Sequence, residues 1–331
     1  MGRRGSAVAS GVVGEGDDQH GARGQRDELS TGIRAGIVAY VVWGLLTIFW
    51  KQLSAFDAVE LIGWRVLFAT VVMAAIVTAR GRWSVLTAAL RTPTVLARLT
   101  LAALLLTANW TCYVIAVTDG RVLETALGYF MAPLGTMVLG IVVLHERPTT
   151  LQRLAMACGA VAVVVLTVSY GRPPVLALVI AVSWSLYGLL KRQVPLSAVE
   201  SLAGETFVLL VPAIAVVAVL AAGSGSIPAT ATAADWALVT LTGAVTAGPL
   251  LLFAVAAQRV PFTILGPLQY LVPTINFLLG WLLYHESIPA VRLLGFALVW
   301  LALAATTIDR LRAAAPPEGG VVPRYAPTRT G

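Results

Sequence analysis

The chain has 331 residues, of which 58% are hydrophobic and only 12% are charged, and its formal net charge at pH 7 is +7. Soluble domains carry about 25% charged residues, so this composition excludes an ordinary soluble globular protein. A positive net charge alone would permit a nucleic-acid partner, but the placement of the basic residues, described below, makes such a partner unnecessary.

Long apolar segments follow one another along the chain. About 20 apolar residues in a helix span the ~30 Å hydrocarbon core of a bilayer, because a helix rises about 1.5 Å per residue. A soluble protein could not bury so many helices that are apolar on every side. We therefore predict an all-α membrane protein with ten transmembrane helices, at residues 33–52, 61–79, 95–117, 124–144, 151–168, 173–190, 201–221, 236–257, 262–284 and 290–308.

The two ends of the chain differ from these segments. Residues 1–32 are polar, rich in glycine and arginine, and lack the apolar core of a signal peptide. Their composition predicts a disordered tail, as does that of residues 310–331. Cys112 and Cys158 lie inside predicted spans without metal or redox spacing, so we interpret them as packing residues.

The basic residues are unevenly divided between the two sides that ten spans would define. The side of the termini holds 18 lysines and arginines, whereas the opposite side holds Lys51, Arg121, Arg172 and Arg292. An excess of basic residues marks the cytoplasmic side. We expect a multi-pass protein of the inner or plasma membrane with both termini in the cytoplasm.

One segment of the chain occurs twice, at a constant offset in the numbering. Residues 133–146 read PLGTMVLGIVVLHE and residues 273–286 read PTINFLLGWLLYHE, and the tripeptide AVE at 58–60 returns at 198–200 with the same offset of 140. Each unit, 33–170 and 171–309, holds five predicted spans. Because five is odd, the second unit enters the membrane from the opposite face, and inverted repeats of this kind underlie many secondary transporters. The repeat thus predicts a substrate site between two halves that alternate access.

The repeated segments share a proline inside a predicted helix. Pro133 and Pro273 lack the N–H that would bond the carbonyls of Tyr129 and Gln269, so both helices are candidates for a break at membrane depth. A kink packed against protein, without a ligand, is the alternative. Gly248-Pro249 is a further flexible point.

Several stretches resemble the RarD group of the EamA-type drug/metabolite transporter superfamily. They include GIVAYVVWGLLTIFWKQL, NWTCYVIAV, LETALGYFMAPLGTMVLGIVVLHER, YGLLKR and LGPLQYLVPTINFLL. The resemblance covers residues 32–309 and implies two five-helix EamA repeats in the inner membrane that export or exchange small molecules. Members of the group commonly have histidine before the arginine of the second span, where this chain has Trp64 before Arg65. Chloramphenicol, from which some members take a name, is not thereby identified as a substrate.

Ionisable residues inside spans cost at least about 2.5 kcal/mol centrally and usually mark pathways or partners. Arg65 and Glu205 are related by the repeat offset and carry opposite charge. Our hypothesis is that they flank one polar cavity, where Arg65 attracts anionic groups and Glu205 binds a cation or proton; a structural pair or a lipid-headgroup contact is the alternative. Glu124 opens a helix and suits either capping or coupling, and Lys51 ends a helix, where it can snorkel.

Polar and aromatic residues within the spans are the candidates for substrate contact. We expect the cavity to be lined mainly by the third, fourth, eighth and ninth spans, with the first, second, sixth and seventh completing it. Asn109 must find a partner on a neighbouring helix or a substrate, and Trp43 suits an aromatic wall or an interfacial anchor. The full candidate set is Asn109, Trp110, Tyr129, Gln269, Tyr270, Asn276, Tyr187 and Trp43.

Other functional classes find little support. His145-Glu146 and His285-Glu286 lack the second histidine of a zinc-protease motif and suit turns and caps, and no phosphate-binding GxxxxGK[ST] loop is present. We expect no enzymatic activity, no metal or other cofactor, and transport coupled to a proton or ion gradient or run as exchange. A membrane-embedded lipid-modifying enzyme and a passive channel are the rivals. Neither the substrate nor the choice between monomer and homodimer follows from the sequence.

Overall fold

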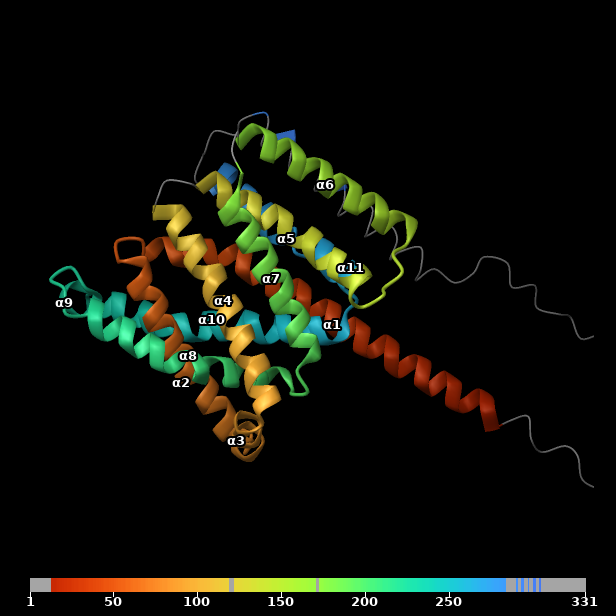
Figure 1. The fold of residues 1–331 in the computed structure, drawn as a ribbon, viewed down its shortest axis with the longest axis horizontal. Coiled ribbons are helices and arrows are strands. Elements are labelled where there is room, and N and C mark those ends of the chain that lie inside the picture. Colours follow the sequence, from red (N-terminus) through yellow and green to blue (C-terminus); the bar gives the residue numbers. More distant parts are fainter. Residues whose placement is uncertain are drawn as a thin grey trace, which may run out of the picture.

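The computed structural model describes residues 13–118, 122–170 and 173–283, together with isolated positions between 290 and 304. Every regular element in this part of the chain is helical, as Figure 1 shows. In chain order the elements are α1 (Val13–Gln52), α2 (Ala58–Ala79), α3 (Trp83–Arg91), α4 (Pro93–Thr118), α5 (Val122–Val142), α6 (Thr150–Tyr170), α7 (Val175–Gln193), α8 (Ala198–Leu220), α9 (Ile227–Thr230), α10 (Ala233–Arg259), α11 (Phe262–Leu268), α12 (Leu271–Leu278) and the π-helical turn η1 (Leu279–Leu283).

Side-chain caps fix where two of the long helices begin. Before α2, the carboxylate of Asp57 accepts hydrogen bonds from the backbone N–H groups of Val59 and Glu60, at 2.9 and 2.8 Å. Before α10, Thr232 and Asp235 form a reciprocal capping box. These bonds satisfy N–H groups that have no partner within the helix, so each apolar segment starts at a defined residue.

The first helix extends beyond the predicted span. It begins at Val13, so residues 13–32 are helical, in contrast to the disordered tail expected from their composition. A polar segment cannot build a core of its own, but a helix already formed by a span can propagate into it without a new nucleation step. In Figure 1 this end of α1 projects away from the bundle. The predicted C-terminal tail, 310–331, lies outside the described residues.

Seven helices within the described ranges are long and apolar enough to cross a bilayer, corresponding to α1, α2, α4, α7, α8, α10 and the α11–η1 segment. Two shorter apolar helices, Leu127–Val142 and Thr150–Val165, lie in α5 and α6. The predicted tenth span falls almost wholly outside the described residues, so the count of ten stays a prediction. Large apolar side chains also face outward: Val168, Val211 and Val219 are 74–75% exposed. Such surfaces suit lipid rather than water. The protein is thus a multi-pass membrane protein.

Most helices of one half of the chain pack against helices of the other half. The pair α2 and α8 is in extensive contact, as is the pair α5 and α11. Helix α1 packs on α10 and α12, whereas α7 packs on α4 and α5. Helix α6 lies against α5 at the outer edge of the bundle (Figure 1). The largest cluster of buried apolar side chains joins α1, α2, α4, α7, α8, α10 and α11.

Two glycines allow neighbouring helices to approach closely. A Cβ at Gly243 of α10 would lie 2.4 Å from the carbonyl carbon of Phe68 in α2, closer than two carbons approach without a bond. A Cβ at Gly135 of α5 would lie 2.5 Å from Oγ of Ser185 in α7. Small residues of this kind permit close packing between membrane helices.

The two repeated prolines behave differently. Helix α5 continues through Pro133 without interruption, contrary to the expected break. The ninth predicted span is interrupted at Gln269 and Tyr270, which separate α11 from α12. Because Pro273 has no N–H for the Gln269 carbonyl, that oxygen instead accepts from the N–H of Val272, at 3.2 Å. The helix break therefore occurs in one of the two repeats.

Buried carboxylates tie each half of the chain to a loop of the other half. Glu60, at the start of α2, accepts hydrogen bonds from the backbone N–H of Ile227 at 3.0 Å and from the indole of Trp64 at 3.1 Å. Glu200, at the start of α8, pairs with Arg82 at 2.7 Å. Both carboxylates are buried, and they occupy corresponding positions of the two repeats. The repeated AVE tripeptide therefore has a structural role.

Candidate functional site

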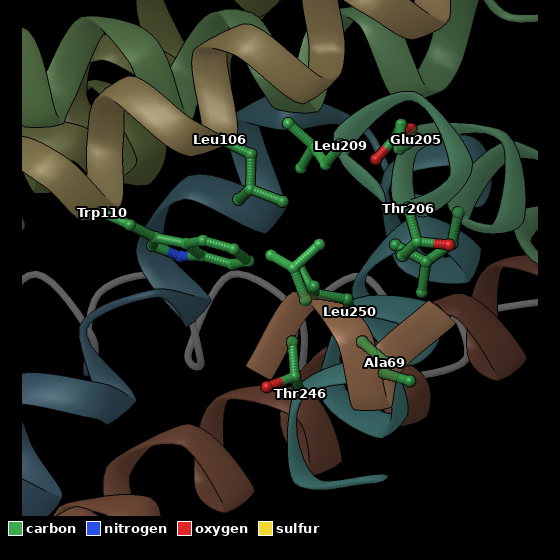
Figure 2. Close-up of a pocket in the computed structure, with 11 residues that line it drawn as sticks. Ala69, Leu106, Trp110, Glu205, Thr206, Leu209, Thr246 and Leu250 are labelled. Atoms are coloured by element: carbon green, nitrogen blue, oxygen red, sulfur yellow. The ribbon is translucent and has the colours of Figure 1, made fainter. Parts of the chain in front are cut away.

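A small cavity lies where α2, α4, α8 and α10 meet. Its lining residues are Val66, Ala69, Leu106, Trp110, Leu202, Glu205, Thr206, Leu209, Thr246, Ala247 and Leu250. Figure 2 shows the Trp110 ring reaching in from one side, with Glu205 and Thr206 across from it and Thr246 below. The space open to the centre of a water molecule is ≈ 10 Å³, about enough for one water. The cavity uses the second, third, seventh and eighth predicted spans, whereas we had expected the third, fourth, eighth and ninth to dominate.

The lining follows the internal repeat. Eight of the eleven lining residues form four pairs that are each related by the repeat offset of 140: Val66 with Thr206, Ala69 with Leu209, Leu106 with Thr246, and Trp110 with Leu250. Corresponding positions of the two repeats thus face one common space. The lining is mostly apolar, with a few polar groups from α8 and α10.

Arg65 lies beside this cavity and contacts two aromatic rings. Its guanidinium carbon is 3.8 Å from the centroid of the Trp110 ring and 5.1 Å from that of Trp50, and its Nε donates to Oγ1 of Thr246 at 2.8 Å. Two of these three partners line the cavity. In the part of the chain that the structure describes, no carboxylate lies within ion-pair distance of Arg65. Thus the cation is held by cation–π contacts and one neutral hydrogen bond.

Glu205 lines the cavity and already has a cationic partner. Its carboxylate forms a buried ion pair with Lys191 of α7 and accepts hydrogen bonds from the hydroxyls of Tyr187, at 3.1 Å, and Ser201, at 3.2 Å. Lys191 also donates to Ser201 at 3.1 Å. Lys191 is one of the 18 basic residues counted above on the side of the termini, but its side chain is fully buried. The sequence feature that could have singled out Lys191 is its offset of 140 from Lys51, the same as that of the internal repeat.

Asn109 serves as a link between helices. Its amide donates to the carbonyl of Ile180, at 2.9 Å, and to Oγ of Ser183, at 3.2 Å, joining α4 to α7. The side chain is 4% exposed, and both amide hydrogens have protein acceptors. Asn109 does not line the cavity described above.

Tyr187 and Trp43 belong to an aromatic cluster next to Glu205. The ring of Tyr187 stacks on that of Phe253 with centroids 5.9 Å apart, and Trp43 meets Trp184 edge to face at 5.2 Å. Trp184 in turn lies 4.8 Å from Phe253. Trp43 therefore packs inside the bundle rather than at its surface.

The residues of the broken ninth span separate into two groups. Gln269 and Tyr270 are buried: the first donates to Oγ1 of Thr136 at 2.9 Å, and the second contacts α5. Asn276 is exposed, and its amide oxygen accepts from the hydroxyl of Thr47 in α1 at 2.8 Å. These contacts join α12 and its junction with α11 to both α5 and α1.

Three further candidates lie away from the cavity. Tyr129 is 37% exposed, with its ring 6.2 Å from that of Tyr113. Lys51 is exposed in the last turn of α1. Glu124 lies in the first turn of α5, but its side chain is outside the described residues.

The first copy of the repeated histidine-glutamate pair, His145-Glu146, has a structural role. His145 adopts a left-handed backbone with φ 54°, which turns the chain back at the end of α5. The Glu146 carboxylate then accepts from the backbone N–H groups of Phe262 and Thr263, both at 2.8 Å, and lies 3.5 Å from Arg192. The residue caps α11, and no cluster of three metal ligands occurs among the described residues. Residues 285 and 286 lie outside that part.

Comparisons with known proteins agree with this architecture. The EamA-like transporter family matches the chain twice, over residues 30–168 and 172–308. Protein RarD of Streptomyces exfoliatus is 41% identical over 288 residues, covering 87% of this chain and 91% of that protein. The uncharacterized transporter YojE of Bacillus subtilis strain 168 is 33% identical over 87% of this chain and 97% of its own length, and protein RarD of Escherichia coli K12 is 32% identical over 85% and 95%. A solved crystal structure with 20% identity shares the fold, with a TM-score of 0.65 over 85% of this chain and 98% of that one.

Proposed function

Because the chain belongs to the EamA-like transporter family and to its RarD group, we propose that it is a secondary transporter that moves a small metabolite or drug by alternating access. The two halves, residues 33–170 and 171–309, form inverted five-helix repeats that rock about the cavity between them. The protein lies in the inner or plasma membrane with both termini in the cytoplasm.

The paired packing of the helices supports two inverted halves. Exchanging each helix for its partner in the other repeat converts the contact between α1 and α10 into that between α7 and α4. It likewise converts the contact between α1 and the α11–α12 segment into that between α7 and α5, whereas the pairs α2 with α8 and α5 with α11 each map onto themselves. Such reciprocity is what a pseudo-two-fold axis through the bundle produces.

The single observation that carries the proposal is the repeat-spaced lining of the cavity. A space bounded by corresponding residues of two repeats lies on the axis that relates them, and both halves can open it in turn. In the present conformation it holds about one water. A larger substrate therefore requires some of the helices around it to move apart.

The candidate residues take different parts in this mechanism. Trp110, Glu205 and the neighbouring Arg65 contact the substrate, with Tyr129 and Asn276 as accessible polar groups on its path. Asn109, Tyr187, Gln269, Tyr270 and Trp43 hold the surrounding helices in register. The break at Gln269 and the Gly248-Pro249 step in α10 are points where the backbone bends during the cycle.

The energy for net transport comes from a proton or ion gradient or from exchange of one substrate for another. A channel would need a continuous polar path, whereas the cavity is small and mostly apolar. A lipid-modifying enzyme would need a cluster of acidic, histidine or nucleophilic residues at one membrane face. Transporters in this family provide the closer precedent.

Labelling of engineered cysteines tests the inverted arrangement. In a background without Cys112 and Cys158, which are free cysteines, a membrane-impermeant thiol reagent added outside should modify Arg121→Cys and leave Arg259→Cys untouched. Inside-out vesicles should show the reverse. Modification of both positions from one side would exclude inverted halves.

Transport itself is tested by comparing the medium of cells that express the protein with that of cells carrying an empty vector. A compound enriched in the medium should then show saturable counterflow in proteoliposomes. Flux that rises linearly with concentration would identify a channel, and a new reaction product would identify an enzyme.

A further inference from the structure

Arg65 is a cation within a membrane span, and its position suits a ligand. It lies seven residues into α2, about 10 Å from the helix end, where an unpaired charge is costly. The Nε hydrogen bond to Thr246 and the contacts with the rings of Trp110 and Trp50 hold the guanidinium in place. No hydrogen bond from either terminal nitrogen of Arg65 is found among the described residues. These nitrogens form the fork that binds a carboxylate through two parallel hydrogen bonds.

The charges at repeat-related positions differ between the two halves. In the second half, Lys191 and Glu205 form a neutral pair. The corresponding positions of the first half hold Lys51 and Arg65, which are both cations. Thus the acid on the cavity wall is neutralised from within the protein, and the positive charge beside the same cavity is not.

The surroundings of Arg65 indicate the rest of the ligand. Most of the cavity lining is aliphatic, including Leu106, Leu209 and Leu250 (Figure 2). A ligand that satisfies both the fork and this lining has an anionic end and an apolar body.

We propose that the substrates are organic carboxylates with an apolar body and that Arg65 binds the carboxylate. Lys191 is the permanent counter-ion of Glu205, so the cavity does not repel an anion. The inference rests on the proposed transport function, and it replaces the hypothesis that Glu205 binds a free cation. Arg65 then selects the substrates by charge.

The experiment compares compounds in the medium of cells that express the wild-type chain, Arg65→Gln, Arg65→Lys or Arg80→Gln, or that carry an empty vector. Arg80 is the matched control, because it is exposed at the opposite end of α2. Membrane insertion of each variant is checked by size-exclusion chromatography of a fluorescent fusion.

Carboxylates should dominate the compounds that the wild type enriches over the vector. Arg65→Gln should reduce their export about 10- to 100-fold, the effect of losing hydrogen bonds to a charged group. Arg65→Lys should fall in between, because a lysine keeps the charge without the fork, and Arg80→Gln should match the wild type. If Arg65→Gln fails to insert into the membrane, the inference is tested by two other results. These are the charge of the compounds that the wild type enriches and the reduced export expected of Arg65→Lys.

Two results separate the two proposals. Enriched compounds that are neutral or cationic, or carboxylates that Arg65→Gln exports as well as the wild type does, would overturn the carboxylate inference and leave transport standing. No difference between wild type and vector would overturn the transport function, and the inference would fall with it.

Discussion

The hydroxyl of Tyr270 donates to the backbone carbonyl of Phe130 at 3.3 Å, and the two residues are 140 positions apart. Their rings also lie close, with centroids 6.4 Å apart. Residues that correspond in the two repeats are therefore in direct contact, and this contact joins α5 to the break between α11 and α12.

Tyr270→Phe should destabilise the protein by about 1 kcal/mol, because the carbonyl of Phe130 loses a hydrogen-bond partner in a buried place. The measurement is the thermal unfolding temperature of the purified chain in detergent. The matched control is Tyr40→Phe. The Tyr40 hydroxyl is the one buried side-chain polar atom in the described part of the chain without a partner, so its removal should be neutral or stabilising. Equal losses in the two variants would contradict the assigned hydrogen bond.

Lys191→Met should destabilise the protein by about 3–5 kcal/mol, because it leaves Glu205 as an unpaired buried carboxylate. Adding Glu205→Gln should recover much of that loss, since no uncompensated charge then remains. The measurement is a double-mutant cycle on unfolding temperature and on yield in the membrane. Additive effects of the two substitutions would show that the ion pair does not form.

Glu146→Ala should loosen the start of α11, because two backbone N–H groups lose their shared acceptor. The measurement is the rate at which a cysteine at Thr263, a buried position, reacts with a thiol reagent in inside-out vesicles. The rate should rise about tenfold, corresponding to about 1.4 kcal/mol of lost protection. Glu28→Ala, at an exposed position of α1, is the control and should leave the rate unchanged.

Gly243→Ala should impair folding strongly, because its Cβ would overlap the backbone at Phe68 and push α10 away from α2. Gly248→Ala lies five residues further along α10, where a Cβ meets nothing within 4 Å. It should fold as well as the wild type or better, since alanine favours a helix by up to about 1 kcal/mol over glycine. Yield in the membrane and unfolding temperature measure both. Reduced transport by a well-folded Gly248→Ala variant would support bending at the Gly248-Pro249 step.

The sequence predicted the helical class and most span positions, because lipid makes the demand for apolar helices strong and local. It did not predict which proline interrupts its helix. Both repeats carry the same proline, but α5 packs closely along α7 at Gly135, whereas the second copy has another proline, Pro267, just before the break. The packing of α5 on α7 and the additional proline at 267 therefore separate the two cases, and the shared proline alone does not.

Composition predicted neither the helix at residues 13–32 nor the burial of Lys191, and the two reasons are related. A polar segment beside a span can join its helix, and a lysine at the end of a span can turn inward when an acid lies there. The pairing of Lys191 with Glu205 depends on the approach of α7 to α8, which no local pattern encodes. The repeat offset was the stronger guide, since it relates four pairs of residues on the cavity wall.

The carboxylates of Glu60 and Glu200 have a consequence for movement within the bundle. Each holds a loop of the opposite half, one through the N–H of Ile227 and the other through Arg82, while α2 and α8 lie along each other between them. Any motion that preserves the hydrogen bond and the ion pair keeps α2 and α8 fixed relative to each other. The outer helices would then move around this pair. A cross-link between α2 and α8 should therefore leave transport unchanged, whereas a cross-link between α1 and α12 should stop it.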